Sequence, residues 1–223
     1  MKRRDWRAGC LGLILLLTAL LFARWLFPAE EATDPAVQED LRAYLPALVG
    51  TTFHFQGSGM EFASFTRRIT FAAPGLVQLE DLSGTNLAQV VAYGPGELKV
   101  IYSEEEFYEQ ASLLDGAARQ GRPQGRAVEL ILLKAPLQVG NTWSDQHFQR
   151  EIAAVGQVVE VPLGTFYDVV VVRSTSKDAP DSVHWEYYAK NVGLIKREFR
   201  LELADGPFAV VSSLQAVGSA PAH

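Results

Sequence analysis

The chain has 223 residues, a formal net charge of −6 and a single cysteine, Cys10. The portion after Phe27 carries about −10, because five of the 20 basic residues and one of the 26 acidic residues precede it. An acidic body of this kind argues against binding to nucleic acid and against electrostatic adhesion to anionic lipid. Because the only cysteine lies before that body, the body has no internal disulfide and no cysteine-ligated metal.

An apolar stretch near the N-terminus, Ala8–Phe27 (AGCLGLILLLTALLFARWLF), has the length of a transmembrane helix. A bilayer core needs about 20 helical residues at about 1.5 Å each, which this stretch just supplies. Its one charged residue, Arg24, can send its guanidinium to the headgroups, and the neighbouring Trp25 suits the interfacial aromatic belt. We therefore expect a membrane-spanning anchor.

The charges in front of the anchor predict its orientation. Four basic residues stand there against one acidic residue, Asp5; they are Lys2, Arg3, Arg4 and Arg7. By the positive-inside rule, this excess leaves the N-terminus in the cytoplasm. Residues 1–28 are then a cytoplasmic tip and a single-pass anchor at the cell membrane, and residues 29–223 are an extracytoplasmic domain.

Two other fates of the N-terminal stretch stay open. A cleaved signal peptide needs small residues after the apolar run, and the best match is Leu21-Phe22-Ala23, directly before Arg24. A lipoprotein carries its modified cysteine after the run, whereas Cys10 stands at its beginning. The anchor is the preferred interpretation.

Helical signals are few in the domain. Asp34-Pro35 is typical of a helix start, and a helix ending near Leu45 would place an apolar stripe on the sheet, formed by Val37, Leu41, Tyr44, Leu45 and Leu48. Ser103-Glu104-Glu105-Glu106 has the pattern of a capping box and predicts a second helix through Leu114. Residues 115–126 are rich in Gly and Arg and are the best linker candidate.

Most of the domain alternates with the period of two that β-strands require. Gly- and Pro-containing turns separate the runs at short intervals, which favours antiparallel hairpins. Val169–Val172 is apolar throughout, as in a strand covered on both faces. The expected strands are 52–55, 65–71, 76–82, 87–93, 98–102, 128–133, 142–148, 152–161, 166–175, 183–189, 194–203 and 208–217.

The two halves of the domain contain similar segments. Pro46–Phe53 (PALVGTTF) aligns with Pro136–Trp143 (PLQVGNTW), with Pro, Val, Gly and Thr in common and an aromatic residue at the end. This predicts two related halves, 29–114 and 127–217, joined by the loop 115–126. A chance match of eight residues is the alternative.

Two further motifs carry a resemblance to a known group. Val161–Val169 (VPLGTFYDV) and Tyr187–Lys196 (YYAKNVGLIK) resemble motifs of uncharacterised secreted or lipid-anchored bacterial domains related to the LolA/LolB lipoprotein carriers. The resemblance implies a curved antiparallel sheet or half-barrel. The expected fold is therefore mainly β (α+β), a curved sheet with a few short helices, preceded by one transmembrane helix.

The sequence contains no recognisable catalytic, cofactor or metal motif. His184-Trp185-Glu186 places a His and a Glu on one strand face, which is more typical of a solvated face than of a metal site. The dipeptides Arg67-Arg68 and Lys196-Arg197 are interpreted as edge charges in solvent. Six aromatic residues form either the core or the lining of an apolar ligand cavity: Trp143, Phe166, Trp185, Tyr187, Tyr188 and Phe199.

Three functions follow as hypotheses. The first is a non-enzymatic, membrane-anchored domain that binds a protein or a cell-envelope component. The second is a carrier or sensor of an apolar ligand, a lipid or lipoprotein, in a groove like that of LolA. The third is a cell-envelope hydrolase, which requires His184 or His147 to meet carboxylates in a cleft.

Overall fold

The computed structural model describes residues 40–203 and 206–219 of the chain. The described residues belong to one compact unit, Gln38–His223. The expected anchor and the Asp34-Pro35 helix start lie outside the described residues. Within the described ranges, no helix has the length and apolarity needed to cross a membrane.

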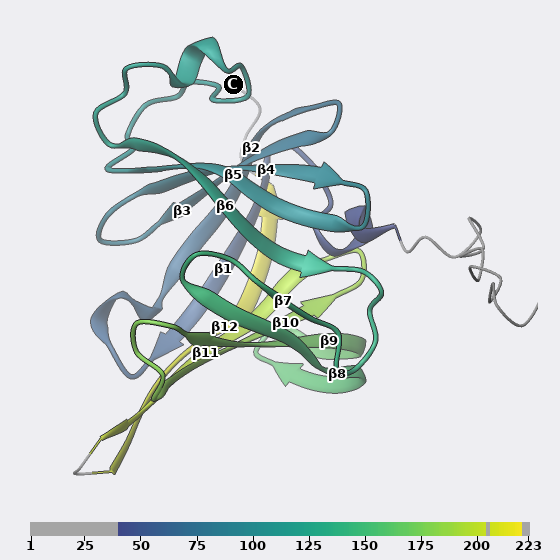
Figure 1. Cartoon of the computed structure of the whole chain (residues 1–223). Helices are drawn as coiled ribbons and strands as arrows, with labels where there is room; N and C mark the ends of the chain where they lie inside the picture. The colour runs from purple at the N-terminus through teal and green to yellow at the C-terminus, as the bar shows by residue number, and fades with distance from the viewer. Residues whose placement is uncertain (1–39, 204–205, 220–223) are drawn as a thin grey trace, which may run out of the picture. The chain divides into compact units, whose positions relative to one another are not determined.

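The described residues form one antiparallel sheet of twelve strands (Figure 1), as the alternation predicts. The first six strands make a meander in which each pairs with the next. These strands are β1 (Thr51–Ser58), β2 (Phe65–Ala73), β3 (Leu76–Leu82), β4 (Leu87–Gly94), β5 (Glu97–Glu105) and β6 (Gly125–Lys134).

The last six strands make a second meander, whose final strand pairs with β1. All four valines of Val169–Val172 are buried in a strand flanked on both sides, as expected. The predicted strand 142–148 is instead two strands joined by a turn. The six strands are β7 (Thr142–Ser144), β8 (Phe148–Val161), β9 (Gly164–Ser176), β10 (Ser182–Ala189), β11 (Gly193–Leu203) and β12 (Gly206–Ser219).

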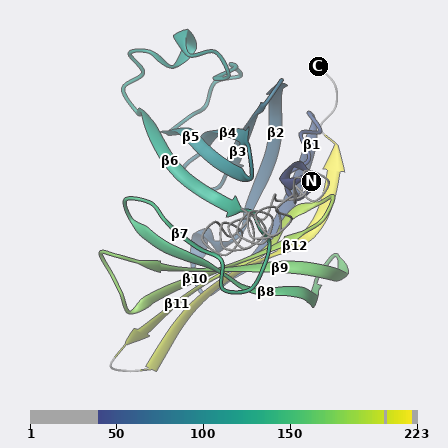
Figure 2. The same ribbon diagram turned by 45° about the vertical axis from the view of Figure 1, so that its right-hand side comes forward.

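The sheet curves until its two edge strands, β6 and β7, face each other (Figures 1 and 2). Two side chains bridge them. The indole N–H of Trp143 donates to the Ile131 carbonyl at 2.9 Å, and the Asn141 amide donates to the Lys134 carbonyl at 3.0 Å. The sheet is therefore nearly closed, and its concave face becomes an interior.

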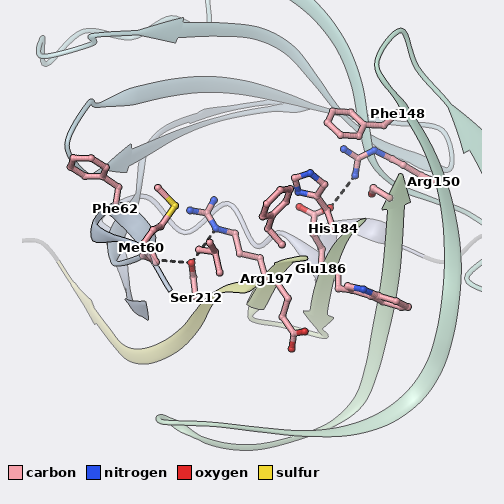
Figure 3. Close-up of a pocket in the computed structure, with 14 residues that line it drawn as sticks. Met60, Phe62, Phe148, Arg150, His184, Glu186, Arg197 and Ser212 are labelled. Atoms are coloured by element: carbon pink, nitrogen blue, oxygen red, sulfur yellow. Dashed lines mark hydrogen bonds and ion pairs between the residues drawn. The ribbon is translucent and has the colours of Figure 1, made fainter. Parts of the chain in front are cut away.

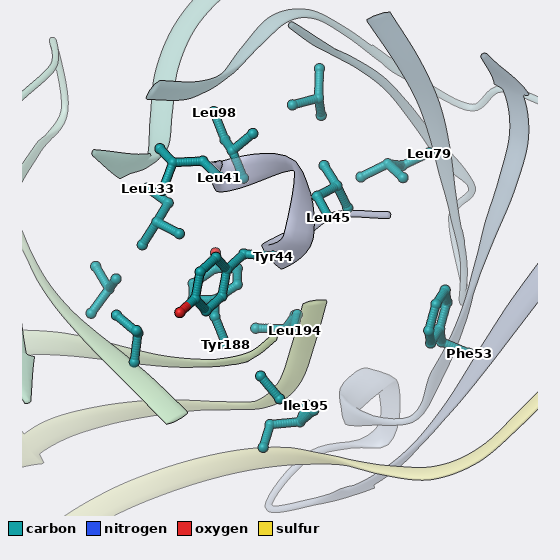
Figure 4. Packing of buried hydrophobic residues seen from close by; sticks show 14 of the residues in the cluster. Leu41, Tyr44, Leu45, Phe53, Leu79, Leu98, Leu133, Tyr188, Leu194 and Ile195 are labelled. Atoms are coloured by element: carbon teal, nitrogen blue, oxygen red, sulfur yellow. The ribbon is translucent and has the colours of Figure 1, made fainter. Parts of the chain in front are cut away.

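Residues before β1 enter that interior. The 3₁₀ helix η2 (Leu41–Tyr44) packs Leu41, Tyr44 and Leu45 among buried side chains of the sheet (Figure 4). The Asn191 amide donates to the Ala43 carbonyl at 2.6 Å, and the Tyr93 hydroxyl donates to the Leu45 carbonyl at 2.5 Å. The expected stripe is thus right at these three positions and wrong at Leu48, which is 64% exposed, while its fifth member, Val37, lies outside the described residues.

The predicted helix 103–114 is wrong. Ser103 and Glu104 continue β5, where they pair with residues of β4 and β6, and the chain from 107 to 114 has no regular structure. This segment packs Phe107 and Leu113 on a second buried cluster, and the Gln78 side chain accepts from the Leu113 amide at 2.7 Å. Strand pairing over long sequence distances has overridden the local capping signal.

The connection between β5 and β6 includes a short 3₁₀ helix, η4 (Ala117–Arg119), within the predicted loop 115–126. Because β6 pairs with β5, that loop lies inside the first meander, and residues 135–141 join the two meanders. The described helices η2, η4 and η3 (Glu61–Ala63) have three or four residues each.

The two similar octapeptides adopt the same turn. Gly50 and Gly140 both have φ +88°, and each amide donates to an Ile carbonyl in the second strand of its meander, Ile69 of β2 at 2.8 Å and Ile152 of β8 at 2.9 Å. Only glycine enters this region of φ without strain. Each turn opens one of the two six-strand meanders. The shared ancestry of the two halves stays a prediction, and these matching geometries are in keeping with it.

Candidate functional site

A pocket of about 310 Å³ opens on the concave face of the second meander (Figure 3). Strands β8 to β12 supply most of its wall, and η3, in the connection between β1 and β2, supplies a lip of apolar side chains. Met60 and Phe62 on this lip are about half exposed, at 51% and 50%. The polar and aromatic lining that matters below is Phe148, Arg150, Ser174, His184, Glu186, Arg197, Phe199 and Ser212.

Alternation along the strands explains why polar groups gather there. On β10, His184 and Glu186 share a face, and on β11 Arg197 shares one with Ile195 and Phe199. Pairing between neighbouring strands brings these polar residues together. Ser174 is the register partner of Arg150 on β8 and of His184 on β10, and Arg197 is the register partner of Glu186 on β10 and of Ser212 on β12.

The lip is held by a close backbone approach at Gly57. A Cβ on this residue would lie 2.1 Å from the Ala63 carbonyl carbon, so no larger residue fits without moving the chain. The Gly57 amide donates to the Ser64 hydroxyl at 2.9 Å, and the Ser212 hydroxyl donates to the Ala63 carbonyl at 2.7 Å. The segment that carries Met60 and Phe62 is therefore tied to β1 and β12 beside the pocket.

Arg150 is the most fully paired cation of the pocket. Its Nη1 lies 3.0 Å from the Glu186 carboxylate, and its Nε lies 3.6 Å from Asp145, with the side chains of Arg150 and Asp145 each only 6% exposed. Tyr188 is a neighbour of Glu186. Burial raises the pKa of the Tyr188 phenol well above its ordinary value, and the nearby Glu186 carboxylate raises it further. Tyr188 is thus a neutral hydrogen-bonding group.

A second arginine, Arg67, lies in the same interior and makes a bidentate pair with Asp81. Its Nε and Nη2 donate to the two carboxylate oxygens at 2.7 and 2.8 Å, and both side chains are about 15% exposed or less. Burial alone would lower the pKa of Arg67, but Asp81 outweighs burial and raises it. The interpretation of Arg67 as a solvated edge charge is therefore wrong.

Arg197 is also wrongly interpreted from the sequence, since it is partly buried on the pocket wall. Its guanidinium lies 4.0 Å over the ring of Phe65, and its Nε is 3.4 Å from the Ser212 hydroxyl. Among the described residues, no carboxylate lies within 4.0 Å of it. Burial lowers the pKa of Arg197, yet an arginine stays protonated in water at neutral pH.

His184 lies between two aromatic rings rather than beside an acid. Its ring centroid is 5.5 Å from that of Phe148 and 4.9 Å from that of Phe199. Burial lowers the pKa of His184, and this outweighs the opposite effect of Glu186. At neutral pH the imidazole is therefore uncharged and serves as part of the aromatic wall.

We expect the stability of the protein to depend on His184 below neutral pH. The unfolded histidine has a pKa of about 6.5, whereas the folded one is lower, so the unfolded chain takes up more protons as the pH falls through that value. Stability contributed by the neutral ring is present above about pH 6.5 and is lost on acidification. Urea unfolding at pH 7.5 and 5.5 should show a smaller pH-dependent loss in His184→Gln than in the wild type.

The exposed His147 gives the matched control, since its side chain is 60% exposed. His147→Gln should keep the wild-type pH dependence. An unchanged pH dependence in His184→Gln would contradict the depressed pKa.

The six aromatic residues named from the sequence lie in different places. Two of them, Trp185 and Phe199, line the pocket. Trp143 and Tyr188 are buried in the main core, with exposed fractions of 5%, and Phe166 and Tyr187 are partly buried against that core. A ligand lining made of all six stays a prediction, and the described pocket contains two.

Sequence reasoning missed the polar members of the pocket, above all Arg150, Arg197 and Ser174. A signal was present for Arg197, because it has the same parity as Ile195 and Phe199, which the alternation assigns to the dry face. Arg150 has a similar signal, since it has the same parity as Phe148 and Ile152, whereas Ser174 lies just after the continuous apolar run Val169–Val172, which shows no alternation. Their neighbours across the strands determine their role.

Among the described residues, neither of the two histidines named for a hydrolase pairs with a carboxylate inside the pocket. His147 meets Asp178 at 3.4 Å, but on an exposed surface away from the pocket lining. His184 has aromatic neighbours, and Glu186 is taken up by Arg150. In residues 40–203 and 206–219, no group of three or more His, Cys, Asp or Glu side chains is placed to hold a metal ion.

Comparison with known proteins gives little beyond this geometry. No protein-family model matches the chain. No curated protein matches it either. Two solved structures are similar in fold. One is a Bacteroides fragilis protein described as exported and as having a YmcC-like fold, with 11% identity, a TM-score of 0.38, and coverage of 77% of this chain and 96% of that chain.

The other is a Parabacteroides distasonis protein described as a lipoprotein, with 12% identity, a TM-score of 0.39, and coverage of 79% of this chain and 98% of that chain. Likenesses this distant carry no argument about the site. The curved antiparallel sheet expected from the LolA/LolB resemblance is present in the structure, and kinship with those carriers stays a prediction.

Proposed function

We propose that the domain is a non-enzymatic binding module that takes an apolar ligand into the pocket on its concave face, as a carrier or sensor. The observation that supports this most is the pocket itself, in which the exposed apolar lip of Met60 and Phe62 opens onto a wall containing Phe199. Side chains of a folded domain normally fill such a space, and large exposed apolar side chains beside it are typical of ligand sites.

The proposed location is the outer side of the cell membrane, with the anchor Ala8–Phe27 holding the domain there and the N-terminus in the cytoplasm. The support is the apolar length and the basic flank of that stretch. A site for an apolar ligand beside a membrane fits a module that takes molecules from the bilayer or reports on them.

Filling the pocket should abolish binding. Val210 lines the pocket, whereas Val211 alternates to the opposite face of β12. We expect Val210→Trp to reduce binding of the neutral dye N-phenyl-1-naphthylamine by roughly tenfold or more, because an indole occupies the space that the dye needs. The measurement is dye fluorescence with the full chain in neutral phosphatidylcholine nanodiscs, corrected with empty nanodiscs.

Val211→Trp is the matched control and should bind the dye like the wild type. Equal binding by both variants, or no binding by the wild type above the empty-nanodisc signal, contradicts the proposed function. In that case a protein partner at another surface becomes the better hypothesis.

A further inference from the structure

We propose that Arg197 and Ser212 form an anion-binding subsite in this pocket, so that the ligand is an amphiphile with a carboxylate or phosphate head and a short apolar part. This inference rests on the proposed function and specifies the ligand class for the same site.

The first step is the distribution of charge among the interior arginines. Arg67 is paired with Asp81 through two hydrogen bonds, and Arg150 has two carboxylates within 4.0 Å. Arg197 has none among the described residues, although Asp81 and Glu186 are near enough to influence it. Those two carboxylates are already held by the other arginines, which leaves Arg197 as the cation without a counter-ion.

The second step is the orientation of the guanidinium. Ser212 donates its hydroxyl hydrogen to the Ala63 carbonyl at 2.7 Å, so its oxygen is left to accept the long 3.4 Å contact from Arg197 Nε. The face of the guanidinium rests on the Phe65 ring at 4.0 Å. With the plane and one edge fixed in this way, the other N–H groups remain for an acceptor that the described protein residues do not supply, and their fork matches a carboxylate or phosphate.

The third step is an independent unpaired group in the same wall. Ser174 is 1% exposed, and its hydroxyl has no hydrogen-bond partner among the described residues. Ser174 lines the pocket. Buried polar atoms are nearly always satisfied in folded proteins, so an unpaired hydroxyl beside a pocket indicates a polar group of a ligand.

The fourth step is size. A volume of about 310 Å³ is at the lower end of the range for small-molecule sites, which is roughly 300–1,000 Å³. The apolar part of the ligand is therefore short, or only one end of a longer chain enters. Met60, Phe62 and Phe199 offer it an apolar surface next to the charged subsite.

The test compares four water-soluble probes by calorimetric titration of the full chain in neutral nanodiscs: hexyl phosphate, hexanoate, 1-hexanol and inorganic phosphate. We expect hexyl phosphate and hexanoate to bind roughly tenfold or more tightly than hexanol, because a charge-assisted pair is added. Arg197→Met should remove this difference, so that hexyl phosphate and hexanoate bind to that variant no more tightly than hexanol does. Arg197→Lys should retain part of it.

Arg200→Met is the matched control, since Arg200 is on the same strand, pairs with Glu198 and is 57% exposed. It should behave like the wild type. Equal affinity for hexanol and hexyl phosphate overturns the anion subsite while dye binding leaves the proposed function standing. If inorganic phosphate binds as tightly as hexyl phosphate, the proposal that the ligand has an apolar part is overturned. If the wild type does not bind the dye, the proposed function itself is overturned.

Discussion

Asp81→Ala should lower the free energy of unfolding by about 3–5 kcal/mol, because it leaves the Arg67 guanidinium in the interior without its carboxylate. Both hydrogen bonds of the pair end on Asp81, at 2.7 and 2.8 Å, and the two side chains are 15% and 13% exposed. Removal of one partner of such a pair exposes the full cost of desolvating the other. Urea unfolding of the full chain at pH 7.5 measures the change.

The double substitution Arg67→Met/Asp81→Leu separates this cost from simple loss of packing. Replacing both charges by apolar groups of similar size should bring stability back to within about 1–2 kcal/mol of the wild type. The exposed pair of Arg126 and Glu105 is the surface control, with side chains 66% and 55% exposed, and Glu105→Ala should cost at most about 1 kcal/mol. A loss in Asp81→Ala no larger than that would contradict a buried pair.

Trp143→Ala should cost about 3–5 kcal/mol, because the substitution empties the space of a side chain that is 5% exposed. It also removes the 2.9 Å hydrogen bond from the indole to the Ile131 carbonyl, which links the two edge strands of the sheet. Trp143→Phe keeps an aromatic ring and loses only the N–H donor, so it should cost about 1–2 kcal/mol.

Hydrogen exchange identifies the site of this loss. In Trp143→Ala, the amides of β6 and β7 should exchange faster relative to those of β1 and β12, because the seam between the edge strands opens first. If exchange rises equally in all strands, or if Trp143→Phe is as unstable as Trp143→Ala, the indole is not the link that closes the sheet.

The twelve strands were largely predictable from sequence, for a physical reason. A strand with one dry face must alternate, and Ile195, Arg197 and Phe199 on one side against Lys196 and Glu198 on the other show how regular this is. The errors came where local signals compete with distant pairing. The sequence at Ser103 does have the capping-box pattern. The backbone of Ser103 and Glu104 pairs instead with strand residues that are 14 to 23 positions away in the sequence.

The site was less predictable because it depends on the curvature of the sheet and on which side chains become neighbours across its strands. The dipeptides Arg67-Arg68 and Lys196-Arg197 look like ordinary surface charge, and only the folded sheet places one arginine of each inside. Whether such an arginine is structural or functional then depends on its counter-ion. Asp81 satisfies Arg67, and no described carboxylate within 4.0 Å satisfies Arg197.

The most direct measurement is native mass spectrometry of the full chain purified from its own membrane, comparing the wild type with the Val210→Trp and Val211→Trp variants. The account predicts a small amphiphilic adduct on the wild type and on Val211→Trp, and its absence from Val210→Trp. A wild-type chain without any adduct, or one that Val210→Trp retains in full, would contradict a ligand in the concave pocket.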